Sequence, residues 1–200
     1  MKKLSQEIVD TLLLYEYISA EKRAAYIYCY SYIIENIKYD LTMLLTGVLL
    51  HRLNATITFI LCFNIYRSFC GGYHAKTPII CNIMSYLIAI LYFGGSFASS
   101  SVFILIFVIP FSISNFIIIF FSPVDCTTKK YTDLQRTTTK KIVLLATFIN
   151  IIIFVFFAIK NQTLYCYSLT FCVMVIAITL IVQIIINTRG THYDNEYCNM

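Results

Sequence analysis

One short segment of the sequence combines residue types that can carry out nucleophilic catalysis. It begins at Arg67, passes through the diglycine Gly71-Gly72, and ends with His74 and Cys81. A cysteine thiolate is a strong nucleophile, and a histidine within hydrogen-bonding reach can take the proton of the thiol. The segment therefore indicates a cysteine nucleophile that is served by a histidine base.

The diglycine and a proline decide whether these two side chains can meet. On one continuous helix, His74 and Cys81 would share a face but stand about 10 Å apart, from the rise of ~1.5 Å per residue. The diglycine can end the preceding helix, and Thr77-Pro78 is typical of the start of a new one. Cys81 would then lie at the end of the first turn, where a helix N-terminus favours a thiolate. We expect a loop that bears His74 to fold back over the helix that bears Cys81.

Other interpretations of the same residues stay open. A lone histidine beside a membrane helix is more often an interfacial residue, and a lone cysteine is more often a packing residue. Cys70, His74 and Cys81 could bind a metal such as zinc, but three ligands without a clear fourth are a weak pattern. Arg67 and Lys76, taken alone, would be interpreted as contacts to lipid head groups. We expect neither a metal nor a cofactor, because thiolate chemistry needs neither.

The composition predicts that this segment is carried by an integral membrane protein. The 200 residues are 59% hydrophobic and only 12% charged, with a mean hydropathy of +0.76. A soluble domain of this size could not bury that much apolar surface. The same numbers exclude a disordered chain and a secreted disulfide scaffold. We expect an all-α, polytopic fold with a single domain over residues 1–200.

Four stretches are apolar and long enough to cross a bilayer, which needs about 20 residues. They are 79–98, 102–121, 142–159 and 164–187. The region 24–66 is less regular and predicts either two short crossings or a re-entrant hairpin, with two crossings favoured. The sequence thus predicts about six transmembrane helices.

The first residues predict an additional, amphipathic helix. Leu4, Ile8, Leu12, Tyr15 and Ile18 recur at helical spacing. Such a helix lies in the membrane interface or packs against the body of the protein, and the sequence favours neither.

The net charge of +5 comes from basic residues in short stretches between the apolar spans. This arrangement is typical of membrane topology and anionic lipids as partners, and not of nucleic-acid binding. The stretch 122–141 contains Lys129 and Lys130 among its basic residues, so we expect it in the cytoplasm. Counting back over two crossings places 67–77 on the same side.

The segment also resembles a known family. Its residues Arg67, Gly71, Gly72, His74, Ala75, Cys81 and Ser85 are similar in type and spacing to a motif of the accessory gene regulator B (AgrB) family. The Ser122-Pro123-Val124 motif that opens the basic stretch agrees with this family, as do the amphipathic start and the polytopic layout.

The resemblance implies a membrane-embedded cysteine endopeptidase of peptide quorum sensing in Gram-positive bacteria. His74 and Cys81 would be its catalytic pair. The substrate would be an AgrD-like propeptide, whose acidic C-terminal tail is removed while the remainder is closed to a thiolactone or lactone. The family is expected to act as a homodimer, with its catalytic residues at the cytoplasmic side of the bacterial cell membrane.

Supporting residues are less specific than the catalytic pair. Four basic residues could attract an acidic propeptide tail, namely Arg67, Lys76, Lys129 and Lys130. A third catalytic group could be Glu35, Ser31, Asn82 or Ser85, although structural roles are more common for each.

The main alternative function is a small membrane transporter or exporter of a signal peptide without peptidase activity. Transporters usually carry charged residues within their spans and an internal sequence repeat. Neither feature is evident in this sequence.

Overall fold

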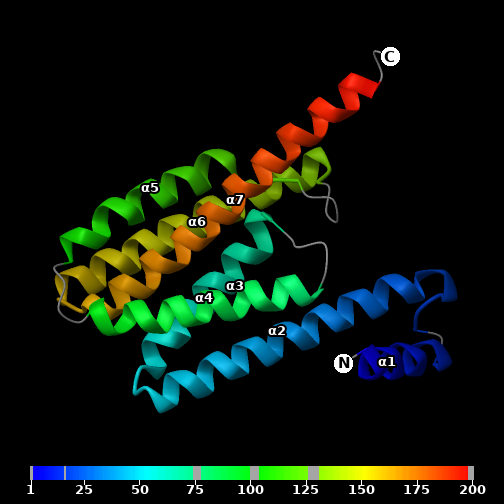
Figure 1. The fold of residues 1–200 in the computed structure, drawn as a ribbon, viewed down its shortest axis with the longest axis horizontal. Helices are drawn as coiled ribbons and strands as arrows, with labels where there is room; N and C mark the ends of the chain where they lie inside the picture. The colour runs from blue at the N-terminus through cyan, green and yellow to red at the C-terminus, as the bar shows by residue number, and fades with distance from the viewer. Residues whose placement is uncertain (1, 16, 74–77, 100–103, 126–130, 198–200) are drawn as a thin grey trace. The chain divides into compact units, whose positions relative to one another are not determined.

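The computed structural model describes residues 2–15, 17–73, 78–99, 104–125 and 131–197 (Figure 1). These residues form α-helices and one short 3₁₀-helix, with no strand among them. The prediction of an all-α fold is therefore confirmed. By its internal contacts the chain divides into two compact units, Met1–His51 and Arg52–Met200.

The first unit is a pair of packed helices. It contains α1 (Lys2–Leu14), the 3₁₀-helix η1 (Ala20–Lys22) and α2 (Arg23–Leu49). Ser31 of α2 donates a hydrogen bond of 2.8 Å to the hydroxyl of Ser5 in α1, and Arg23 forms an ion pair of 2.8 Å with Asp10. Helix α1 thus packs against α2 within this unit. A position in the membrane interface remains a prediction for the exposed apolar side chains of α1, such as Leu14.

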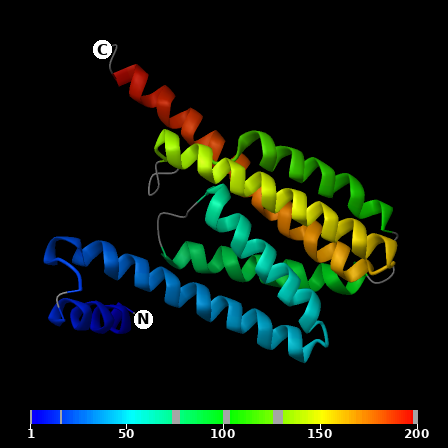
Figure 2. The same cartoon turned by 180° about the vertical axis from the view of Figure 1, so that it is seen from behind.

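The second unit is a bundle built around its last helix. It contains α3 (Leu53–Cys70), α4 (Pro78–Ser99), α5 (Leu105–Phe121), α6 (Asp133–Ile159) and α7 (Thr163–Tyr197). Helix α7 packs against each of the other four. Figures 1 and 2 show α7 running between α5 and α6 on one side and α3 and α4 on the other.

The predicted spans agree well with these helices. Three helices are long and apolar enough to cross a membrane, within Ile80–Phe97, Asp133–Ile159 and Thr163–Thr188, and Leu105–Phe121 is a shorter apolar helix. The region 24–66 forms two helices, α2 and α3, joined by a short turn. Two helices joined by a turn fit both interpretations of this region, so two crossings of the bilayer remain a prediction.

Local sequence explains where the helices of the second unit begin and end. Helix α3 stops at Cys70 because Gly71 and Gly72 adopt φ angles of +74° and +107°, which favour glycine. Helix α4 starts at Pro78, as predicted. Thr132 caps α6 by accepting a hydrogen bond from the Gln135 amide, while the Gln135 side chain accepts one from the Thr132 amide.

Polar side chains lock the apolar core between helices. The Tyr92 hydroxyl of α4 lies 2.9 Å from the Ser168 hydroxyl of α7, and the Tyr167 hydroxyl donates to the Tyr92 carbonyl at 3.0 Å. Gly95 makes this approach possible, because a Cβ atom there would lie 2.3 Å from the Tyr167 hydroxyl oxygen. These hydrogen bonds hold α4 firmly against α7.

Candidate functional site

The diglycine turn after α3 is held by the linker between α5 and α6. Gly71 pairs through its backbone with Val124, and the Val124 amide donates to the Cys70 carbonyl at 3.1 Å. A Cβ atom on Gly71 would stand 2.5 Å from the Val124 carbonyl oxygen. Only glycine fits this close approach, so two motifs that lie far apart in the sequence meet here.

The residue that precedes the predicted catalytic histidine is anchored from two helices. Arg67 of α3 donates from its Nη2 atom to the Tyr73 carbonyl at 2.5 Å. The Tyr73 amide donates to the Thr179 carbonyl of α7 at 3.1 Å. The Nη1 atom of Arg67 is buried and makes no hydrogen bond. Arg67 thus holds the backbone of Tyr73, the residue directly before His74 in the sequence.

Cys81 lies where the sequence predicts it. It is the fourth residue of α4 and is half-buried. Ser85 follows one turn later on the same helix and is also half-buried, as is Asn82. His74 and Lys76 lie outside the described residues, so the contact between His74 and Cys81 stays a prediction.

Two other candidate residues from the sequence analysis contribute to packing in the structure. Cys70, proposed as a possible metal ligand, has an exposed fraction of 0%. Ser31, proposed as a third catalytic group, is engaged in the hydrogen bond with Ser5 that joins α1 to α2. Glu35 lies on the same helix as Ser31 and is half-buried.

The linker between α5 and α6 is organised by Asp125. Its carboxylate accepts a hydrogen bond of 3.0 Å from the Tyr131 amide and pairs with Arg136. The Tyr131 hydroxyl in turn reaches the Phe69 carbonyl of α3 at 3.5 Å. Lys129 and Lys130 lie outside the described residues, but the linker that carries them is bound at both ends to the region of the diglycine turn.

One basic residue of this stretch is already engaged. The Nζ atom of Lys140 donates to the carbonyls of Ile119 and Ser122, with 2.8 Å to the second. These carbonyls belong to the C-terminal end of α5, where a cation is favourable. Lys140 therefore stabilises a helix end and is a poor candidate for substrate binding.

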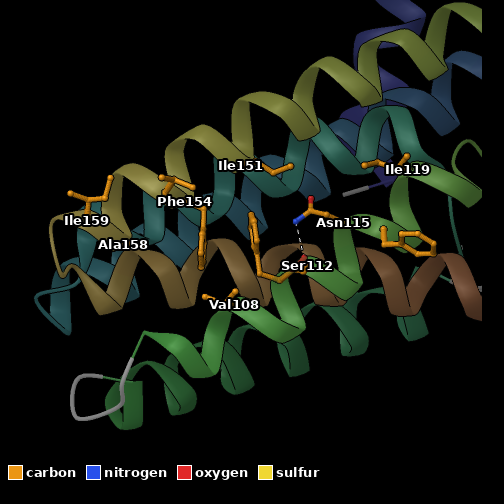
Figure 3. A pocket seen from close by; sticks show the side chains of 11 residues that line it. Val108, Ser112, Asn115, Ile119, Ile151, Phe154, Ala158 and Ile159 are labelled. Atoms are coloured by element: carbon orange, nitrogen blue, oxygen red, sulfur yellow. Dashed lines mark hydrogen bonds between the residues drawn. The ribbon is translucent and has the colours of Figure 1, made fainter.

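A well-defined pocket among the described residues lies elsewhere. It has a volume of about 610 Å³ and is lined by side chains of α5 and α6, including Phe111, Asn115 and Phe154 (Figure 3). None of the residues that the sequence singles out lines it. Its walls are almost entirely apolar, and no cysteine, histidine or carboxylate is among the residues that line it.

The sequence analysis missed the contribution of α7 to the site. Three polar residues of this apolar helix, Thr179, Gln183 and Asn187, follow one another at intervals of four and therefore share a face. Asn187 donates from its side chain to the Asp125 carbonyl at 2.9 Å. The signal was present in the sequence, because polar residues inside an apolar span commonly have a role.

Comparison with known proteins gives one match. The family model described as Accessory gene regulator B matches residues 1–186. No curated protein and no solved structure matches the chain.

Proposed function

The chain belongs to the accessory gene regulator B family, which processes signal propeptides of quorum sensing, and we propose that it is a membrane-embedded cysteine endopeptidase. Cys81 would be its nucleophile and His74 its general base. The observation that carries this proposal is the half-buried thiol in the first turn of α4, the helix that follows the anchored diglycine turn in the sequence. Residues 1–200 would act as one peptidase domain.

The proposed reaction begins with attack of the Cys81 thiolate on a propeptide carbonyl. His74 takes the thiol proton and returns it to the leaving amine as the C–N bond breaks. Backbone N–H groups at the start of α4 would stabilise the oxyanion. The acidic tail leaves with the proton, and an acyl thioester on Cys81 remains.

Closure of the ring would follow by exchange of one thioester for another. A cysteine of the bound propeptide loses its proton and attacks the acyl carbon, and the Cys81 thiolate leaves. The new thioester conserves most of the bond energy that hydrolysis would release. A shielded site at the membrane boundary and the high effective concentration of the peptide thiol both favour cyclisation. A serine in place of that cysteine would give a lactone.

The propeptide would be held by charge as well as by shape. Lys129 and Lys130 lie on the linker that is bound to the diglycine turn, and Lys76 lies between His74 and Cys81 in the sequence. An acidic tail would be drawn to this group of cations. We place the site at the cytoplasmic side of the bacterial cell membrane and expect a homodimer.

The test uses the purified protein in lipid with an AgrD-like propeptide and reads the intact masses of protein and peptide. The variants are Cys81→Ala and His74→Ala, with Cys29→Ala as a control because Cys29 is exposed on α2. We expect a tail-free peptide, lighter by one water than the hydrolysed form, from wild type and the control only. An acyl adduct should appear on Cys81 alone.

Three outcomes would contradict the proposal in different ways. An unprocessed propeptide with the wild type and with every variant would favour the transporter or exporter. A linear, tail-free peptide would indicate a plain protease without cyclisation. Full activity of Cys81→Ala would exclude this thiol as the nucleophile.

A further inference from the structure

Helix α7 carries a polar stripe across an otherwise apolar span. Gln183 is almost completely buried, with 4% of its surface exposed. Its Nε2 atom donates to the Oδ1 atom of Asn187 at 2.8 Å. A buried amide in an apolar environment is costly unless it is hydrogen-bonded. The hydrogen bond to Asn187 compensates for the burial of the Gln183 amide. It does not explain why two amide side chains occur within this apolar helix.

The stripe contacts both loops that carry the predicted functional residues. The Nδ2 atom of Asn187 donates to the Asp125 carbonyl at 2.9 Å. Two turns earlier on the same face, the Thr179 carbonyl accepts from the Tyr73 amide at 3.1 Å. The loops also contact each other, through the Val124 amide and the Cys70 carbonyl. Figure 1 shows the end of α3 beside α7, where these contacts lie.

The side-chain amides of Gln183 and Asn187 make different contacts. Because the Oδ1 atom of Asn187 is held by Gln183, the Nδ2 atom is directed at the Asp125 carbonyl. Asp125 contacts Tyr131 and Arg136 through its carboxylate, whereas it meets Asn187 through its backbone carbonyl. Loss of the Asn187 bond would thus leave the linker folded within itself and release it from α7.

We propose that Asn187 is a positioning residue that holds the Asp125 linker to α7, and that Gln183 orients it. Together they hold the start of the linker, at Val124 and Asp125, where it meets the diglycine turn. The role in catalysis rests on the proposed function, whereas the anchoring of the linker can be tested without it. Neither residue touches the reacting atoms.

The first test measures hydrogen exchange of the full-length protein in lipid. Asn187→Asp keeps the shape of the side chain but has no N–H donor, so the Val124 amide, which bonds to the Cys70 carbonyl, should exchange roughly fivefold faster. The Tyr131 amide, which bonds to Asp125 within the linker, should exchange as in wild type. Gln183→Leu should show the same change, since an apolar side chain suits the span. The control is Thr188→Val, because the Thr188 hydroxyl bonds to the Ile184 carbonyl within α7. Unchanged exchange in both variants would overturn the inference.

The second test separates binding from chemistry with an acidic-tailed propeptide. For Asn187→Asp we expect KM to rise about three- to tenfold, while kcat stays within about twofold of wild type, for a loss on the scale of one hydrogen bond. Asn187→Gln, which retains the donor, should restore KM. An equal loss in kcat with an unchanged KM would contradict a role in holding the linker.

The two proposals fail in distinguishable ways. A wild-type protein that processes no propeptide would refute the peptidase, and the exchange experiment would still decide whether Asn187 anchors the linker. A wild-type protein that processes the propeptide, with an Asn187→Asp variant equal to it in KM and in exchange, would refute only the anchoring role.

Discussion

At the level of single residues, the position of a cysteine on its helix decides whether its sulfur can meet a substrate. Cys70, Cys166 and Cys172 are completely buried and fill space between helices. Cys81 is half-buried in the first turn of α4. A buried thiol behaves as a small apolar group, so only a partly exposed one can serve as a nucleophile.

This difference predicts the order in which the thiols react. With a short pulse of N-ethylmaleimide, Cys81 should be alkylated before Cys70 and Cys172, because the reagent cannot reach a sulfur with no exposed surface. Peptide mapping by mass spectrometry gives the order, and in a Cys29→Ala background the loss of processing should follow the labelling of Cys81. Labelling of Cys70 as fast as that of Cys81 would contradict this expectation.

The basic residues of the stretch 122–141 differ in the contacts that they make. Lys140 is engaged at the end of α5, whereas Lys129 and Lys130, which lie outside the described residues, are the proposed contacts of an acidic substrate. Replacing these two lysines with glutamine should raise KM roughly three- to tenfold at low salt, and the effect should shrink at high salt. Lys160→Gln, at the opposite end of α6, is the matched control. Salt-independent kinetics in the double variant would argue against steering by these charges.

At the level of elements, the turn after α3 depends on a close backbone approach. Gly71 combines a φ angle of +74° with the contact to the Val124 carbonyl. Neither feature tolerates a side chain. The turn thereby joins the end of α3 to the linker that follows α5, and it sets where the loop with His74 begins.

Gly71→Ala should therefore disrupt the site, while Gly94→Ala should not. The alanine at 71 would clash with the Val124 carbonyl, so we expect a lower melting temperature and a loss of processing of at least about tenfold. Gly94 lies within α4, and a Cβ atom there would meet nothing within 4 Å. The alanine at 94 should be neutral or stabilise the protein by up to about 1 kcal/mol. Thermal unfolding and the processing assay on both variants give the comparison; equal behaviour would contradict it.

At the level of the whole molecule, the charge of the loops predicts the orientation in the membrane. The linker 122–132 and the following start of α6 are basic, whereas the turn between α6 and α7 contains only Lys160. Since cytoplasmic loops carry an excess of basic residues, both the linker and the diglycine turn should face the cytoplasm. The hydrogen bond between Val124 and Cys70 requires that these two segments lie on one side.

An epitope tag can test this orientation. A tag inserted after Asn161 should bind antibody in intact protoplasts, and a tag inserted between Lys130 and Tyr131 should bind only after permeabilisation. The reason is that α6 lies between the two positions and is long and apolar enough to cross the membrane. Detection of both tags in intact protoplasts would show that α6 does not cross as predicted.

The helices and the candidate site were predictable to different extents. Apolar stretches and local end signals located α4 and α5 closely, because a run of apolar residues and a cap such as Pro78 are properties of neighbouring residues. They located only the apolar parts of α6 and α7, because the polar start of α6 and the polar end of α7 extend beyond the apolar stretches. The position of Cys81 in the first turn of α4 followed from the same local signals. The irregular region 24–66 was harder to interpret, since its tyrosines and charges interrupt the apolar pattern of α2 and α3.

By itself, the sequence determined that this is an all-α membrane protein, where four of its apolar helices lie, and which histidine and cysteine could form a catalytic pair. The tertiary structure decided which distant segments meet. It joined Gly71 to Val124, directed Asn187 at Asp125 and assigned Ser31 and Lys140 to packing and capping. The physical reason is that hydrophobic periodicity depends on neighbouring residues, whereas helix packing depends on many interchangeable apolar contacts. Only the packed bundle brings the polar groups of separate loops and helices within hydrogen-bonding distance.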